Sequence, residues 1–63
     1  SLPSAMEQAD YHAFLAALLQ RNGRHNSAIV HYLISLKKSP HSVIWWMGLV
    51  ISLKADNQPD KAL

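Results

Sequence analysis

The sequence predicts an all-α fold of antiparallel helix hairpins, with three helices and the start of a fourth. Three segments carry apolar residues at the three- and four-residue spacing of a helix face, and no segment indicates a strand. The segments are separated by short connections that contain Gly23, Pro40 and Pro59. Short connections force consecutive helices to run antiparallel.

Length and composition limit the chain to one small domain or a piece of a larger one. It has 63 residues, 49% of them hydrophobic, and no cysteine, which excludes a disulfide framework, a cysteine-based zinc finger and a thiol nucleophile. Its mean hydropathy is near zero. The most apolar run, Val43–Leu53, is shorter than the roughly 20 residues that span a bilayer. We therefore expect a soluble, folded segment that does not insert into a membrane.

The first helix is expected to begin as early as residue 5, because Ser4 and Glu7 have the spacing of a capping box. Asn22 and Gly23 should end it, since glycine tolerates the left-handed conformation that terminates helices. The residues predicted to form its apolar face are Tyr11, Phe14, Leu15, Leu18 and Leu19.

The second helix is expected to be capped by Asn26 or Ser27 and to end at Lys37 and Lys38, whose charges suit the negative end of the helix dipole. Pro40 disfavours helical geometry at the preceding residue and closes the segment. The predicted apolar face consists of Ile29, Tyr32, Leu33 and Leu36.

Ser42 is expected to cap the third helix, which is apolar nearly all round. The residues predicted for its helical face are Trp46, Leu49, Val50 and Leu53. Residues 56–59 indicate a turn, and a fourth helix is expected to start at Asp60.

The sequence also shows weak self-similarity at an offset of 34 residues. The identical pairs are Leu15 with Leu49, Leu19 with Leu53, and Ala28 with Ala62. Asn22 and Gly23 correspond to Asp56 and Asn57 at the same offset. The matched positions are therefore those that a helix-hairpin repeat needs for packing, for its turn and for the close contact between its helices.

At this offset the residues resemble the tetratricopeptide repeat (TPR), a helix hairpin of 34 residues. Residues 9–42 resemble one repeat, residues 43–63 resemble the first two-thirds of another, and residues 1–8 precede them as a boundary segment or helix extension. The matching positions are Leu15, Ala16, Leu19, Asn22, Gly23, Ala28, Tyr32, Ser35 and Pro40, and then Trp46, Leu49, Val50, Leu53, Asp56, Asn57 and Ala62. The departures are His12, Leu19, Ser35 and Val50, which replace the residue types usual in the family. The resemblance implies a fragment of a right-handed α-α superhelix and a non-catalytic scaffold that binds a protein or peptide.

In TPR arrays the first helices of successive repeats line a concave groove that holds a partner. The resemblance places the following residues in such a groove: Asp10, Ala13, Ala17, Gln20, Arg21, Ile44, Met47, Ile51 and Lys54. Because a repeat helix buries its apolar face against the next helix, we also expect a self-associating patch, and hence a homo-oligomer of the segment. The residues expected to form that patch are Trp45, Trp46, Leu49 and Leu53.

A narrower resemblance is to the C-terminal TPR region of biogenesis proteins of the MSHA type IV pilus in Gram-negative bacteria. It is carried by residues 10–25 and residues 43–59. It implies an assembly factor associated with the bacterial inner membrane, with its repeats on the periplasmic side, its anchor outside this segment, and pilus-assembly proteins as partners.

Catalytic and metal chemistry is not expected, and neither is a cofactor. His25 and His31 lie six residues apart and so on different helix faces, and no pair has the His-x3-His spacing of zinc ligands. The four carboxylates, which general acid-base catalysis would need near other titratable groups, lie near the two ends of the chain at Glu7, Asp10, Asp56 and Asp60.

Two alternatives to a peptide-binding scaffold remain open. One is a structural self-assembly segment without a peptide ligand. The other is a small helical nucleic-acid-binding domain, since Arg21 and Arg24 flank a glycine-containing turn. The second helix offers no Arg, Asn or Gln in its N-terminal turns beyond Ser27 to read base edges, so we expect no nucleic-acid partner.

Overall fold

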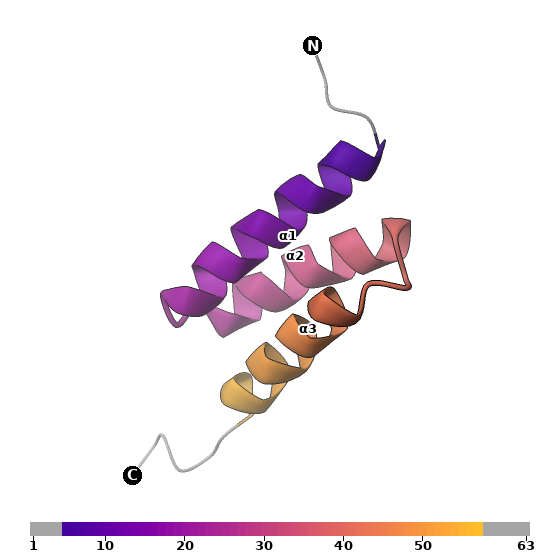
Figure 1. Ribbon diagram of the computed structural model, residues 1–63. Helices are drawn as coiled ribbons and strands as arrows, with labels where there is room; N and C mark the ends of the chain where they lie inside the picture. The colour runs from indigo at the N-terminus through magenta and orange to yellow at the C-terminus, as the bar shows by residue number, and fades with distance from the viewer. Residues whose placement is uncertain (1–4, 58–63) are drawn as a thin grey trace, which may run out of the picture.

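The computed structural model describes residues 5–57, and there it consists of three α-helices without a strand. α1 spans Ala5–Arg21, α2 spans His25–Lys38 and α3 spans Val43–Asp56. α1 and α2 form an antiparallel hairpin, and α3 turns back along α2 in roughly the direction of α1 (Figure 1). The predicted all-α hairpin fold is therefore confirmed. The expected Ser4 cap and the fourth helix from Asp60 lie outside the described residues.

Gly23 ends α1 in the way the sequence predicts. Its φ of 78° is in the left-handed region. The amide of Gly23 donates to the carbonyl of Gln20 (3.0 Å), and the amide of Arg24 donates to the carbonyl of Leu19 (2.8 Å). This pair of bonds is the Schellman arrangement, which satisfies carbonyls at a helix end.

The start of α2 differs from the prediction. Because the glycine motif completes the turn quickly, α2 begins at His25 and the residue before it is Arg24, whose side chain makes no capping hydrogen bond. Asn26 and Ser27 lie inside the first helical turn, so the prediction that one of them caps the helix is wrong.

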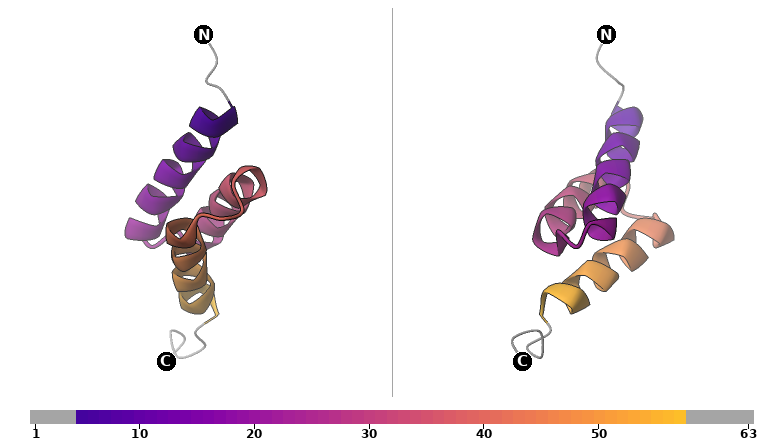
Figure 2. Two further views of the ribbon diagram at one scale, coloured as in Figure 1. Left: turned by 45° about the vertical axis from the view of Figure 1, so that its right-hand side comes forward. Right: turned by 90° about the vertical axis from the view of Figure 1, so that its left-hand side faces the viewer.

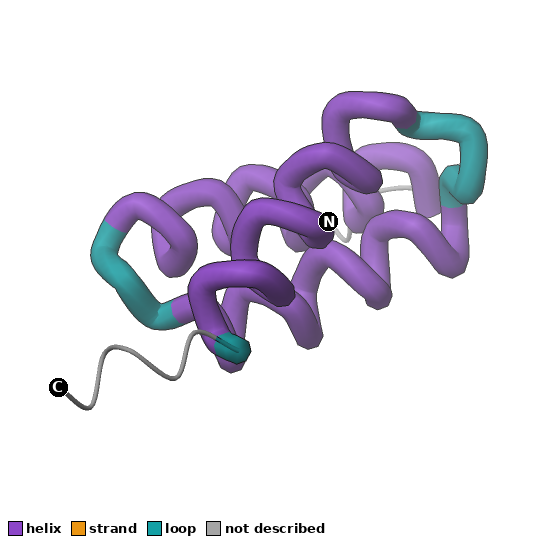
Figure 3. The backbone as a smooth tube through the Cα atoms, turned by 90° about the horizontal axis from the view of Figure 1, so that it is seen from below, coloured by secondary structure: helices purple, strands orange, loops and turns teal. Residues whose placement is uncertain are grey.

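The connection between α2 and α3 follows the prediction. α2 ends at Lys38, and the amide of Ser39 donates to the carbonyl of Ser35 (3.0 Å). Ser42 caps α3, its hydroxyl oxygen accepting a hydrogen bond from the amide of Trp45 (3.3 Å). The two loops lie at opposite ends of the helices (Figure 3).

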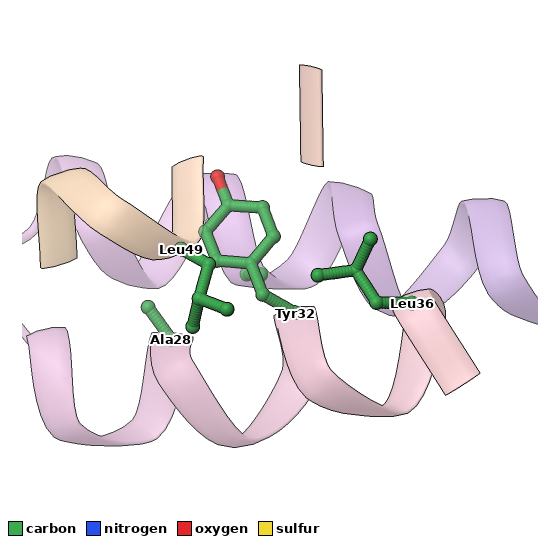
Figure 4. Close-up of a cluster of buried hydrophobic side chains, with 5 residues drawn as sticks. Ala28, Tyr32, Leu36 and Leu49 are labelled. Carbon is green, nitrogen blue, oxygen red and sulfur yellow. The ribbon is translucent and has the colours of Figure 1, made fainter. Parts of the chain in front are cut away.

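The core is small and lies where the three helices meet. It is formed by Ala16, Ala28, Tyr32, Leu36 and Leu49, with Leu19, Ile29 and Trp45 packed against it. Three side chains of α2 point towards the other helices, and Leu49 reaches among them from α3 (Figure 4).

The buried side of α1 is made of alanines. Ala9, Ala13 and Ala16 are buried, at the i, i+4, i+7 spacing of one helix face. Small side chains let α1 and α2 approach closely, so the large residues of α1 are displaced from the contact. The periodicity placed Tyr11, Phe14 and Leu18 on the apolar face of α1 and Leu33 on that of α2. All four side chains are exposed, so this part of the prediction is wrong.

α1 and α2 are also joined by polar contacts. The buried hydroxyl of Ser35 donates to the carbonyl of Ala9 (2.7 Å), and Nδ1 of His12 lies 3.0 Å from Nδ1 of His31. Ser35 and His12 therefore both take part in contacts that join α1 to α2.

α3 lies at the margin of the molecule, with α2 on one side of it (Figure 2). Its contacts with α2 are extensive, and α1 touches it mainly near the C-terminal end of α1. Within the described part of the chain, no helix has the length and apolar character needed to cross a bilayer.

Candidate docking surface

The side of α3 that faces away from α2 carries a continuous apolar surface. Five side chains line an open groove of about 340 Å³, and we call them the outer face of α3: Val43, Trp46, Met47, Val50 and Ile51. Their spacing is i, i+3, i+4, i+7, i+8, which places them on one side of the helix. All five are exposed, so the described residues do not cover this face.

Trp46 is held in place at the start of this face. Its indole Nε1 donates to the carbonyl of Pro40 (2.8 Å), across the connection between α2 and α3. The single polar atom of the ring is therefore satisfied, and the exposed part of the Trp46 side chain is apolar carbon.

The opposite side of α3 attaches it to the hairpin. Gly48, Leu49 and Ser52 are buried there, and Trp45 is half-buried against the core. α3 is thus apolar on both sides, as the sequence predicts, but the two sides have different roles. The inner side packs against the hairpin, and the outer side is exposed.

Gln20 links α1 to the inner side of α3. Its amide Nε2 lies 2.8 Å from both the carbonyl of Gly48 and the hydroxyl of Ser52, and donates to each. The same hydroxyl lies 3.0 Å from Nδ1 of His25, the first residue of α2. Ser52 is fully buried, so this contact with a histidine fixes α3 and does not present a nucleophile.

Tyr32 occupies the space that Gly48 leaves open. A Cβ built on Gly48 would meet Cζ of Tyr32 and would lie 2.5 Å from its hydroxyl oxygen and 2.8 Å from Cε1. The Tyr32 hydroxyl donates to Oε1 of Gln20 at a long 3.4 Å. Burial raises the pKa of this hydroxyl above its usual value of 10.0, because the phenolate would lose its hydration.

No charged residue lies between Ser42 and Leu53. Lys54 follows on the same side of the helix as Met47 and Val50, being seven and four residues further along. The outer face of α3 is therefore an apolar surface with one cation at its C-terminal end.

The residues expected in a groove do not form one continuous surface. From α3, Met47 and Ile51 line the observed groove, and Ile44 and Lys54 are exposed beside it. From α1, Asp10, Ala17 and Arg21 are exposed on that helix, outside the groove lining. Ala13 is buried and Gln20 is committed to its bonds with α3, so neither is free to contact a partner.

The residues expected to form a self-associating patch are also divided. Trp46 and Leu53 are exposed, but Leu49 is only 4% exposed and Trp45 packs against the core. Leu49 is therefore part of the packed side of α3, and Trp45 is partly buried on that side. The predicted helical face of α3 combined the buried Leu49 with Trp46, Val50 and Leu53, which are exposed, and it did not include the exposed Val43. The spacing that starts at Val43 is the signal that would have placed Val43 and Val50 on the exposed side.

A second apolar stripe lies on α1, formed by Tyr11, Phe14 and Leu18. At the 34-residue offset, Phe14 corresponds to Gly48 and Leu18 to Ser52. The α1 stripe thus occupies the positions equivalent to the inner side of α3. Its side chains are large at two positions where those of α3 are small.

Among the described residues, no group of three or more His, Cys, Asp or Glu side chains is placed to hold a metal ion. Comparisons with protein-family models, with curated proteins and with solved structures found no match to this chain. Its function is therefore inferred from its own residues.

Proposed function

We propose that this chain is a non-catalytic protein-interaction module, and that its outer face of α3 binds an apolar helix or extended segment of a protein partner. The observation that carries the proposal is the open groove of Val43, Trp46, Met47, Val50 and Ile51 on a helix whose other side is already packed. The largest exposed apolar patch on a small domain is often an interaction site.

The internal offset of 34 residues supports this surface. It relates Val43, Met47 and Val50 of α3 to Ala9, Ala13 and Ala16 of α1. In α1 those positions are buried under α2. The outer face of α3 thus occupies the positions equivalent to the face of α1 that α2 covers. A helix is therefore the kind of partner that suits this face.

The composition of the groove favours a partner with an apolar face. Met47 is flexible and adapts to varied shapes, and Trp46 gives a large anchor whose polar atom is already bonded. Lys54 can pair with a carboxylate at one end of the bound segment.

The TPR resemblance supports a module that acts within an array of such hairpins. The narrower resemblance, to the pilus biogenesis protein MshN, supports a place in MSHA type IV pilus assembly, on the periplasmic side of the bacterial inner membrane. On this proposal the partners are other pilus-assembly proteins.

A peptide-display selection tests the docking surface with a matched pair of variants. Amphipathic helical peptides selected against the protein are titrated into Val50→Asp and Val30→Asp. The two valines are equally exposed, at 50% and 51%, but lie on α3 and α2 respectively. We expect Val50→Asp to weaken binding at least tenfold and Val30→Asp to leave it unchanged. Equal behaviour of the two variants would show that the partner binds elsewhere.

A further inference from the structure

We propose that the outer face of α3 binds the same face of a second copy of this chain, with the two α3 helices antiparallel and Met47 near the two-fold axis. This inference rests on the proposed function, because it names one occupant of the same docking surface. It differs from the sequence expectation in its residues, since Leu49 is buried and Trp45 is partly buried against the core, and Val43 and Val50 take their place.

The apolar area is enough for a weak dimer. The five side chains of the outer face are each between 46% and 68% exposed. That corresponds to roughly 500 Å² of exposed surface per chain, so two copies face to face would bury at most about 1,000 Å², the lower limit for a specific interface. Ile44 and Leu53, exposed at the edges of the face, add to this area.

Two copies of the outer face of α3 can meet without bringing like charges together. An isologous contact sets each patch against its own copy, so any charge within it would meet a like charge. The stretch from Ser42 to Leu53 contains none. The indole nitrogen of Trp46 is bonded to Pro40 within its own chain, so pairing leaves no donor of that ring unsatisfied.

Lys54 determines the relative direction of the two helices. In a parallel pair the two Lys54 side chains would lie side by side. In an antiparallel pair centred on Met47, each lies seven residues from the axis, so the two are about 21 Å apart at 1.5 Å per residue. That separation exceeds the Debye length of about 8 Å at physiological salt, so their repulsion is screened.

Because the sequence contains no cysteine, a single introduced cysteine can form a disulfide only with the same residue of a second copy. In Met47→Cys the two introduced thiols face each other across the axis. Helices packed 8–10 Å apart, with Cα atoms about 2.3 Å from each axis, bring facing Cα atoms to roughly 4–5 Å, close to the range a disulfide bridges. We expect Met47→Cys to form a disulfide-linked dimer under mild oxidation, and the double variant Met47→Cys/Val50→Asp to lose at least nine-tenths of it.

Two controls define the outcomes that overturn the proposal. Val30→Cys, on the exposed side of α2, should remain monomeric, and equal crosslinking of Val30→Cys and Met47→Cys would show only random collision. A mixture of Met47→Cys and Phe14→Cys tests head-to-tail contact between α3 and the α1 stripe. A predominant mixed disulfide there would replace the two-fold model. Circular dichroism of each variant confirms that its helices are intact.

Sedimentation of the unmodified chain separates this inference from the proposed function. A dimer that dissociates on dilution, and that Val50→Asp converts to monomer, supports the inference. A monomer at millimolar concentration overturns it. If that monomer still binds selected helical peptides through Val50, the docking surface stands and only the second copy is excluded as its occupant.

Discussion

The imidazole rings of His12 and His31 face each other across the α1–α2 hairpin, nitrogen to nitrogen. Their Nδ1 atoms are 3.0 Å apart, and their ring planes are nearly parallel at 16° with centroids 5.2 Å apart. Two such rings reach this nitrogen distance only if the nitrogens lie between the centroids and point at each other. One ring therefore donates and the other accepts, and the short gap between the nitrogens excludes a metal ion from that line.

Removing this bond should cost modest stability. We expect His12→Leu and His31→Leu each to lower the free energy of unfolding by about 1 kcal/mol, because each leaves the remaining imidazole without its partner. The double variant should be less unstable than the sum of the two, with a coupling of about 0.5 kcal/mol or more. Urea unfolding of the four proteins measures the cycle, and strict additivity would mean that the contact does not stabilise the hairpin.

Gly48→Ala should destabilise the protein through Tyr32. Alanine gains about 1 kcal/mol of helix propensity, but its methyl group meets the Tyr32 ring, and overpacking costs about 1–3 kcal/mol. We expect a net loss that Tyr32→Leu removes, so that Gly48→Ala becomes neutral or stabilising in that background. Gly23→Ala is the control. Its cost of about 1 kcal/mol comes from the positive φ of Gly23 and not from a clash, so Tyr32→Leu should not rescue it. Thermal unfolding of the single and double variants tests this, and failure of Tyr32→Leu to rescue Gly48→Ala would contradict it.

The hydrogen bonds of Ser52 and Ser35 should stabilise different helices. Both are fully buried serines, but Ser52 bonds to Gln20 and His25, whereas Ser35 bonds to the carbonyl of Ala9. We expect Ser52→Ala to accelerate amide hydrogen exchange in α3 by about tenfold and Ser35→Ala to act on the first half of α1. A uniform change along the chain in both variants would show that the two contacts do not act locally.

Tyr32 should ionise at a higher pH in the folded protein than in the unfolded chain. Burial raises the pKa of Tyr32, so its neutral form is favoured by folding. The stability this contributes is complete below the unfolded pKa of 10.0, and it is lost as the pH rises from there through the folded pKa of Tyr32. In Tyr11→Phe, where Tyr32 is the remaining tyrosine, tyrosinate absorbance should therefore rise at a higher pH in the folded protein than in the same variant unfolded in urea. Coincident curves would contradict the assigned burial.

The sequence predicts the helices well and their packed faces poorly. The helix ends at Gly23 and Ser42 depend on local backbone chemistry, so they can be predicted from a few adjacent residues. Burial depends on the neighbouring helix. In α1 the contact uses alanines because α2 approaches closely, and a periodicity that counts large apolar residues therefore selects Phe14 and Leu18, which are exposed.

The same limit applies to the docking surface. α3 is apolar on both sides, so its sequence does not indicate which side packs. That choice depends on Tyr32, which requires glycine opposite its ring, and on Gln20, which finds its acceptors at Gly48 and Ser52. Both residues are distant in sequence from α3.

Phe14 and Gly48 are equivalent positions at the 34-residue offset, and their difference in size limits how copies of this hairpin could stack. The inner side of α3 accepts a tyrosine ring because Gly48 has no side chain, whereas the equivalent place on α1 is filled by Phe14. If two copies of this chain were fused in tandem, α1 of the second could not seat against a preceding helix as α3 seats against α2. A longer array built from this hairpin would therefore need Phe14 and Leu18 changed to small residues before its copies could stack.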